Sequence, residues 1–514
     1  MPDQNRRWTI VGPVLVSFVT VVILIFFVLG LCAEENWRAK RKLSRCENEL
    51  KARGENLDLA SFIPPPVPDA ENFAMASLLA PVFKATGEET AQKTKPRDPA
   101  LEHLVKVNVN VLMKAELKRA GGLGDYETGR PIDLVEWQRY FQNDVQQNAA
   151  ADQHEAGRAV LAWLSRWSSE LEEFAAAANR RYARFPLDYS KGLGVPLPHL
   201  LFLQHFSAAY CLRANAALEA GELDLAFRNL QTLDRIQAAI RSEPLLISHL
   251  VRIVIIKLLL QVVWQGSLDH RWTDERLQEI SEMLAKSHLL VDYERVIRGE
   301  RAFSNDQYEK FRRRRDGIRS IVSEQLAWLN TPGGLSNWML VVLPKNAVIS
   351  RNQEWSERWV QDHVLPIIDA RARRIHPEIQ KEAERISAEA KSTPYNFVAK
   401  IAVDIYASVT ERTAATQVAI DEARVACALE RFRLRTGEFP QTLDALIPNY
   451  LSAVPHDIVN DAPLRYRREA DGTYTLYSVG WNEVDDGGVI KLKSGNPSRR
   501  DDKQGDWIWP SVRR

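Results

Sequence analysis

An uninterrupted apolar run near the amino terminus constrains this chain more than any other feature. Residues 8–31 contain no charged side chain, and charged residues flank the run on both sides. A helix of about 20 apolar residues crosses the roughly 30 Å hydrocarbon core of a bilayer. Trp8 and Trp37 lie near the two ends, where indoles favour the membrane interface. The sequence therefore predicts a short tail over 1–7 and a single transmembrane anchor helix over 8–31.

A cleaved signal peptide is the alternative interpretation of this run. Signal-peptide cores usually hold about 7 to 15 apolar residues before a small-x-small cleavage site. This run is longer, and it ends Leu31-Cys32-Ala33. A lipoprotein signal would need a small residue before Cys32, and Leu31 is not small. We therefore favour a retained anchor.

The orientation of the chain in the membrane is less directly indicated by the sequence. Cations after the run outnumber the two arginines before it, so loop charge alone would keep the long side inside. Large domains, however, translocate with little regard to local charge, and a short tail before a single span is typical of an exported bulk. We expect the bulk to be extracytoplasmic.

Composition limits the function classes. At 514 residues the chain exceeds the size of one hydrophobic core, so at least two domains are expected beyond the anchor. Lys+Arg number 68 and Asp+Glu 67, whereas a general nucleic-acid binder carries a large basic excess. No nucleic-acid partner is therefore expected. The four cysteines include no C-x-x-C pair and leave the redox compartment open.

The middle of the chain is predicted to be helical. Residues 32–100 combine a charged helix with a proline-rich spacer, because proline fixes φ and removes an amide donor. Residues 101–400 predict a large helical bundle or a tetratricopeptide-like domain, with one hairpin turning at Gly221. Polar residues on one face of Leu245 to Trp264 indicate a soluble core helix rather than a second span.

Catalytic motifs do not stand out in this sequence. It contains no G-x-x-x-x-G-K-[ST] loop, no H-E-x-x-H pair and no G-x-S-x-G elbow. His199, His205 and His249 lie among apolar residues, where we expect hydrogen-bonded structural histidines. The basic cluster from Lys310 to Arg319 follows several acidic residues, and we interpret it as a solvated helix face rather than a lipid or nucleic-acid site.

The C-terminal part combines helix and strand signals. A helical stretch ends at Gly437, which suits a left-handed helix cap. Two segments of alternating character then flank Asp471-Gly472 and predict a β-hairpin. We place a small α+β module with an antiparallel hairpin over 411–492 and a C-terminal tail over 493–514.

Six short blocks follow one another in this module. They are Ala428-Leu429-Glu430-Arg431-Phe432; Gly437-Glu438-Phe439-Pro440 with Leu443 and Leu446; Val454-Pro455-His456-Asp457; Pro463-Leu464-Arg465-Tyr466; Leu476-Tyr477-Ser478-Val479-Gly480; and Asp485-Asp486-Gly487-Gly488. In order and spacing they resemble the globular domain of the major pseudopilin of type II secretion. The whole chain also resembles uncharacterised bacterial membrane-anchored envelope proteins, which implies a place in the bacterial inner (cytoplasmic) membrane.

The resemblance implies a calcium site, because pseudopilins of that kind bind calcium in the loop after the hairpin. The matching positions are Asn482, Asp485 and Asp486. Calcium takes about six to eight oxygens, and an acidic loop with glycines can supply several. The chain departs from the family at Asn482, where aspartate is preferred. It also lacks, within residues 1–8, the glycine, phenylalanine and glutamate that precede a pseudopilin's membrane helix.

These patterns predict a mostly α protein. Its C-terminal module has a pseudopilin-like fold attached to a different type of membrane anchor, so we do not expect a fibre subunit. We expect a single-pass membrane-anchored envelope protein that acts as a binding or scaffold component, with a protein partner on its helical domain. Two alternatives stay open: an accessory protein of a type II secretion-like machine, and an envelope hydrolase with a site in the helical domain. An aromatic groove would favour binding, and a pocket that gathers histidine and carboxylates would favour catalysis.

Overall fold

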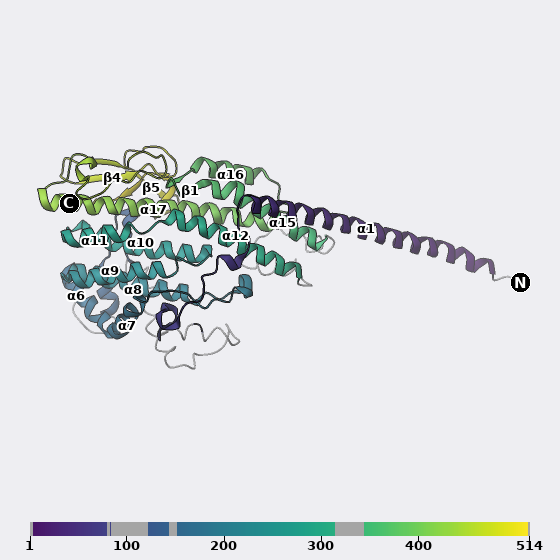
Figure 1. Cartoon of the computed structure of the whole chain (residues 1–514), viewed down its shortest axis with the longest axis horizontal. Helices are drawn as coiled ribbons and strands as arrows, with labels where there is room; N and C mark the ends of the chain where they lie inside the picture. Colours follow the sequence, from purple (N-terminus) through teal and green to yellow (C-terminus); the bar gives the residue numbers. More distant parts are fainter. Residues whose placement is uncertain (1–3, 80–82, 84–121, 143–151, 314–343, 512–514) are drawn as a thin grey trace. The chain divides into compact units, whose positions relative to one another are not determined.

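Helices dominate the computed structural model, which describes residues 4–79, 83, 122–142, 152–313 and 344–511 (Figure 1). Small antiparallel sheets lie in its C-terminal part, so the predicted mostly helical class is confirmed. The α-helices are α1 (Gln4–Ala52), α5 (Leu134–Gln142), α6 (Gln153–Leu164), α7 (Ser168–Ala178), α8 (Pro198–Ala220), α9 (Leu223–Ala239), α10 (Leu246–Leu268), α11 (Asp274–Leu284), α12 (Leu289–Arg313), α15 (Lys345–Trp359), α16 (Pro377–Glu389) and α17 (Phe397–Thr436).

The helix α1 is continuous from the apolar run into the charged segment that follows (Figure 1). The large apolar side chains between Leu15 and Leu31 are mostly exposed, and none of the apolar window is buried inside the protein. Further along the same helix Ala39, Leu43 and Cys46 are buried at helical spacing, and they form one packed face. The helix thus has an unburied apolar part and a docked amphipathic part.

The chain forms two compact units. The first combines Met1–Leu59, Arg301–Val364 and Ala383–Ile405, and the second combines Ala60–Glu300, Leu365–Glu382 and Tyr406–Arg514. In the first unit α1 packs along α15, and the side-chain oxygen of Asn36 accepts a hydrogen bond from the Ala347 amide at the start of α15 (2.7 Å). A small core accompanies this pair, consisting of Tyr308, Phe311, Val348, Ile349 and Val398.

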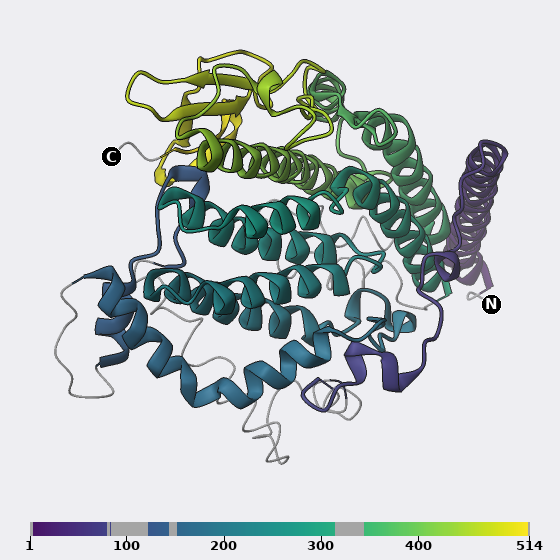
Figure 2. The same cartoon turned by 60° about the vertical axis from the view of Figure 1, so that its left-hand side comes forward.

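The second unit is built around three mutually packed helices, α8, α9 and α10 (Figure 2). The turn between α8 and α9 occurs at Gly221, which adopts φ +79° as a left-handed helix cap, so the predicted turn is confirmed. Burial covers 72% of the apolar window of α10. Although α10 is long and apolar enough to cross a bilayer, its burial agrees with the predicted core helix.

The predicted β-hairpin is confirmed within the second unit. Strands β3 (Arg465–Arg468) and β4 (Tyr474–Ser478) pair antiparallel across a turn at Gly472. The short strands β1 (Ile368–Asp369) and β2 (Arg374–Ile375) form a separate antiparallel pair. The sheet that contains β4 lies along α17 (Figure 2). Leu429 of α17, Leu476 of β4 and Trp509 of the last strand are all buried in one hydrophobic cluster.

Residues 493–514 were predicted to be a C-terminal tail, and that prediction is wrong for most of them. The segment instead contributes to β5 (Ile490–Lys493) and forms β6 (Asn496–Gly505) and β7 (Trp507–Trp509). Strand β7 pairs with β4 and buries both of its tryptophans. Trp507-Ile508-Trp509 is a short run of apolar β-forming residues, all of them buried, and that run was the signal for a buried strand.

A buried ionic network fixes β6 to the helical core. Arg500 is 5% exposed, and its guanidinium lies 2.8 Å from the Glu127 carboxylate, which also accepts from Lys257 of α10 at 2.8 Å. Burial alone would raise the pKa of Glu127, but Arg500 and Lys257 outweigh it and lower this pKa to about 2. The Glu127 carboxylate is therefore charged at neutral pH, and it ties two distant segments together.

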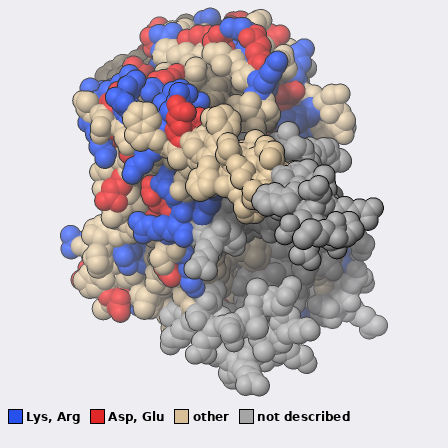
Figure 3. Space-filling model, turned by 90° about the vertical axis from the view of Figure 1, so that its right-hand side faces the viewer, with Lys and Arg blue, Asp and Glu red and all other residues tan. Residues whose placement is uncertain are grey.

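The surface carries both signs of charge. On the face shown in Figure 3, lysine and arginine side chains are mixed with aspartate and glutamate side chains over the described residues. Part of the predicted basic helix face lies at the end of α12, where Lys310 pairs with Asp306, Arg312 pairs with Glu309, and Arg313 is exposed. The cluster's other arginines lie outside the described residues.

Candidate functional site

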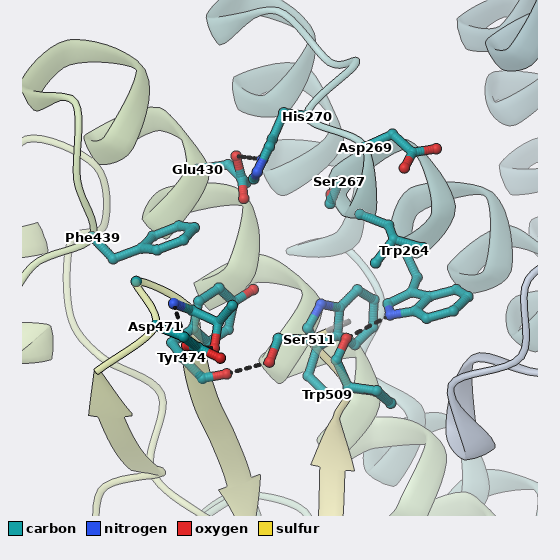
Figure 4. A pocket seen from close by; sticks show the side chains of 14 residues that line it. Trp264, Ser267, Asp269, His270, Glu430, Phe439, Asp471, Tyr474, Trp509 and Ser511 are labelled. Atoms are coloured by element: carbon teal, nitrogen blue, oxygen red, sulfur yellow. Dashed lines mark hydrogen bonds and ion pairs between the residues drawn. The ribbon is translucent and has the colours of Figure 1, made fainter. Parts of the chain in front are cut away.

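A cavity of about 300 Å³ in the second unit is the candidate functional site (Figure 4). Its walls come from the end of α10 and the turn after it, from α17 and the loop that follows, from the β3–β4 turn with the start of β4, and from the end of β7. The lining residues are Trp264, Ser267, Leu268, Asp269, His270, Glu430, Phe439, Asp471, Gly472, Thr473, Tyr474, Trp509, Pro510 and Ser511.

The turn after α10 holds His270 at the cavity. His270 has φ +53°, a left-handed conformation that is uncommon for a residue with a side chain. Its amide donates to Ser267 O at 3.1 Å, and the next amide, of Arg271, donates to Gly266 O at 2.8 Å, which closes the end of the helix. Arg271 also pairs with Glu219 of α8 at 2.7 Å. The backbone on both sides of the His270 side chain is therefore held in place by hydrogen bonds.

The imidazole of His270 is oriented by Glu430 of α17. The Nδ1 atom of His270 lies 2.9 Å from Glu430 Oε2, and the same oxygen accepts from Arg433 Nε at 3.0 Å. The Glu430 side chain is 5% exposed, and that of His270 is 32% exposed. A carboxylate oxygen accepts hydrogen bonds, so the contact with Glu430 matches the tautomer of His270 in which Nδ1 is the donor. In the neutral imidazole the Nε2 atom is then left as an acceptor.

Aromatic rings form most of the remaining wall. Phe439 and Tyr474 lie on one side of the cavity in Figure 4, and Trp264 and Trp509 lie on the other. The rings of Phe439 and Tyr474 pack edge to face, with 4.8 Å between their centroids. Trp264 donates its indole N–H to Pro510 O at 2.7 Å, so its polar group is satisfied within the chain. Burial, reinforced by Glu430, raises the pKa of Tyr474 well above its usual value, which keeps its hydroxyl protonated.

The hydroxyl groups of the two serines in the cavity donate hydrogen bonds to backbone carbonyls. Ser267 donates to Val263 O at 2.9 Å, and Ser511 donates to Tyr474 O at 2.5 Å. Neither contact places a serine hydroxyl on the imidazole of His270, which a serine nucleophile with a histidine base would require. The arrangement therefore offers a polarised imidazole beside carboxylates and aromatic faces, a combination suited to holding a ligand.

The predicted calcium ligands lie together in the loop between β4 and β5, outside this cavity. Asp485 accepts from the Tyr477 hydroxyl and the Gly487 amide, both at 3.0 Å, and lies 3.3 Å from the Arg465 guanidinium. The Gly487 amide in particular lowers the pKa of the Asp485 carboxyl. Asn482 donates to Asp486 Oδ2 at 3.1 Å.

A buried carboxylate that was not predicted organises the same loop. Asp506 has no exposed surface and accepts from the amides of Asp486, Gly488 and Val489. Within the described ranges, no three His, Cys, Asp or Glu side chains are grouped in a way that could hold a metal ion. Calcium at Asn482, Asp485 and Asp486 stays a prediction.

The apolar-flanked histidines His199 and His249 make internal hydrogen bonds. His199 Nε2 lies 2.8 Å from Glu243 Oε1, and His249 Nε2 lies 3.0 Å from the Thr413 hydroxyl. Burial, followed by the charge of Arg252, lowers the pKa of His249 to about 3, so this imidazole is neutral. Burial also lowers the pKa of His205. The contacts of His199 and His249 agree with the structural role predicted for them, and for His205 the agreement rests on its burial.

Sequence reasoning missed the cavity because its parts are far apart in the chain. His270 and Glu430 are separated by 160 residues, and Trp264 and Pro510 by 246. The available signals were local: a polar Asp269-His270 pair directly after an apolar helix, and tryptophans at strand spacing near the end of the chain. Comparison of the chain with protein-family models, curated proteins and solved structures found no match.

Proposed function

We propose that this chain is a single-pass envelope protein of the bacterial inner membrane, with its bulk outside the cytoplasm, and that it serves as a binding or scaffold component. The exposed apolar part of α1 is the observation that carries the proposal. Monomeric soluble proteins rarely expose contiguous apolar patches of more than a few hundred Å², and residues 15–31 form an apolar helix without any buried window. A bilayer is the environment that satisfies such a surface.

The docked part of α1 supports a retained anchor. Beyond residue 38, α1 buries a face against α15, so the apolar part emerges from the first unit as a continuous helix. A reporter fusion after residue 100 tests the orientation. Active alkaline phosphatase is expected, whereas inactive phosphatase beside an active cytoplasmic reporter would reverse the topology.

The cavity beside His270 is the binding site in this proposal. Its aromatic walls provide apolar surface for a ligand to contact, and its few polar groups provide hydrogen bonds that orient the ligand. This is the usual composition of a ligand-binding site. The type II secretion-like accessory role is a version of the same proposal in which the partner belongs to a secretion machine. The identity of the captured partner separates the two.

A capture experiment with the detergent-extracted full chain tests the binding role. His270→Asn removes the imidazole, and asparagine tolerates the left-handed backbone at this position. The matched control is His376→Asn, because Nδ1 of His376 likewise lies 3.0 Å from a carboxylate, that of Glu378, and His376 does not line the cavity. We expect a partner retained by the wild type and the control but lost with His270→Asn. Equal capture by all three would remove the cavity from the proposal.

Hydrolysis is the second candidate, favoured by the hydrogen bond between His270 and Glu430. A histidine oriented by a buried carboxylate is an arrangement that general bases use. A panel of chromogenic esters and peptides would reveal this activity. Turnover that His270→Asn abolishes and His376→Asn preserves would favour the hydrolase over the scaffold.

A further inference from the structure

We propose that the cavity beside His270 binds an organic cation, with the guanidinium group of an arginine side chain on a protein partner as its occupant. This inference rests on the proposed binding function and specifies its ligand. Three properties of the cavity support it: the charge of its lining, the aromatic faces of its walls and its size.

The lining is acidic. Asp269, Glu430 and Asp471 contribute carboxylates, and neither lysine nor arginine lines the cavity. Arg271 and Arg433, which lie outside the lining, pair with Asp269 and Glu430 and offset part of this charge, so the lining keeps an acidic excess of one carboxylate. Glu430 is the most buried of the three, and its Oε2 atom already accepts from His270 and Arg433, so its Oε1 atom is the oxygen that a ligand would use, where water screens the charge less. A ligand that brings a positive charge is therefore complementary to these walls, and an anion is not.

The aromatic faces favour a flat or apolar cation over a metal ion. The rings of Trp264, Phe439, Tyr474 and Trp509 surround the space, and a cation over such a ring is attracted by the ring quadrupole. The chain already provides one example, because the guanidinium of Arg433 lies 5.9 Å from the Phe439 ring centroid while its Nε donates to Glu430. In the proposal, a second guanidinium uses the same pairing of ring and carboxylate from inside the cavity.

The size of the cavity restricts the ligand further. A volume of about 300 Å³ lies at the lower end of the range for ligand sites, which suits one side chain or a small amine. An arginine side chain combines a planar charged group with an apolar stem. Because the scaffold role implies a polypeptide partner, we assign the cavity to a partner's arginine rather than to a free amine.

Titration calorimetry on the detergent-solubilised full chain tests the inference. The probe is arginine capped at both ends, and capped citrulline is the control, since it has nearly the same shape without the charge. Choline tests a free organic cation. Arginine should bind at least about tenfold more tightly than citrulline, which corresponds to about 1.4 kcal/mol. Equal affinity for arginine and citrulline, or tighter binding of choline than of arginine, would overturn the assignment.

Two substitutions locate the site. Asp471→Asn and Glu430→Gln should each weaken arginine binding about tenfold, whereas Asp444→Asn, a carboxylate outside the cavity, should leave it unchanged. Unchanged binding in both cavity variants would also refute the proposal. A chain that ends at Ser511 is titrated in parallel. It lacks Arg513 and Arg514, which follow the lining residue Ser511 in the sequence, so these arginines cannot compete with the added arginine.

The outcome is separable from that of the proposed function. A chain that stays in the membrane and captures a partner through His270, yet does not distinguish arginine from citrulline, fails only this inference. A chain that leaves the membrane on alkaline extraction fails the proposed function, whatever its cavity binds.

Discussion

Replacing Glu357 by glutamine should stabilise the first unit at neutral and alkaline pH. Glu357 lies on α15 and has no exposed surface, and its Oε2 atom has no hydrogen-bond partner in the described part of the chain. Gln353 donates to the other oxygen at 3.2 Å, and Cys46 of α1 also hydrogen-bonds the carboxylate. Burial, followed by the charge of Glu47, raises the pKa of Glu357 from 4.5 to about 7.

The sign of the pH dependence follows from this shift. Below the unfolded value of 4.5 the carboxyl is protonated in both states and has no effect on their difference. As the pH rises from 4.5 to about 7, the unfolded chain loses its proton first, so the stability of the first unit falls. The shift of roughly 2.5 units corresponds to about 3 kcal/mol, at about 1.36 kcal/mol per unit. Glutamine keeps the shape and removes the titration.

Hydrogen exchange of peptides from 345–359 measures this effect locally. After correction for intrinsic rates, protection of α15 in the wild type should fall by most of that 3 kcal/mol between about pH 5 and 8. Protection in Glu357→Gln should fall much less, and the slope that remains belongs to Glu47 of α1, whose pKa burial also raises. Glu49→Gln, an exposed glutamate on α1 of the same unit, is the control and should retain the wild-type slope. A flat wild-type profile, or an unchanged slope in Glu357→Gln, would refute the reasoning.

Further predictions concern the second unit. Glu127→Gln should lower the free energy of unfolding by about 3 kcal/mol at pH 7, because the pKa of Glu127 in the folded protein is lowered from 4.5 to about 2. The difference in stability between the wild type and this variant should disappear as the pH falls from 4.5 to about 2, and urea titrations at several pH values measure it. Gly266→Ala should destabilise by about 1–3 kcal/mol, since a Cβ there would lie 2.1 Å from the Trp272 indole nitrogen, and Gly194→Ala, with open space around it, should not lower the thermal midpoint comparably. If the loop at Asp485 binds calcium, EDTA should lower the melting temperature of the wild type but not of Asp485→Asn; no shift with EDTA removes the calcium site.

Much of the fold was predictable because its signals are local. Helical periodicity identified α8, α9 and α10, and glycines at Gly221 and Gly437 marked helix ends, where both adopt positive φ. The Asp471-Gly472 pair predicted the hairpin for the same reason: the turn requires a residue that tolerates positive φ.

The cavity and the two compact units were not predictable from local patterns. The pairing of His270 with Glu430 depends on how α10 packs against α17, and no periodicity in either segment encodes that register. Residues 493–514 were misread because charged residues in β6 concealed a strand, while the stability of the segment comes from Arg500 and the buried tryptophans of β7. Non-local burial, rather than local propensity, decides such elements.

Alkaline carbonate extraction combined with amino-terminal sequencing tests the central claim most directly. The account predicts that the full-length chain stays in the membrane pellet and that its sequence begins within the first few residues, ahead of the apolar run. A chain recovered in the soluble fraction with its first residue beyond Cys32 would contradict the anchor and the membrane-bound role built on it.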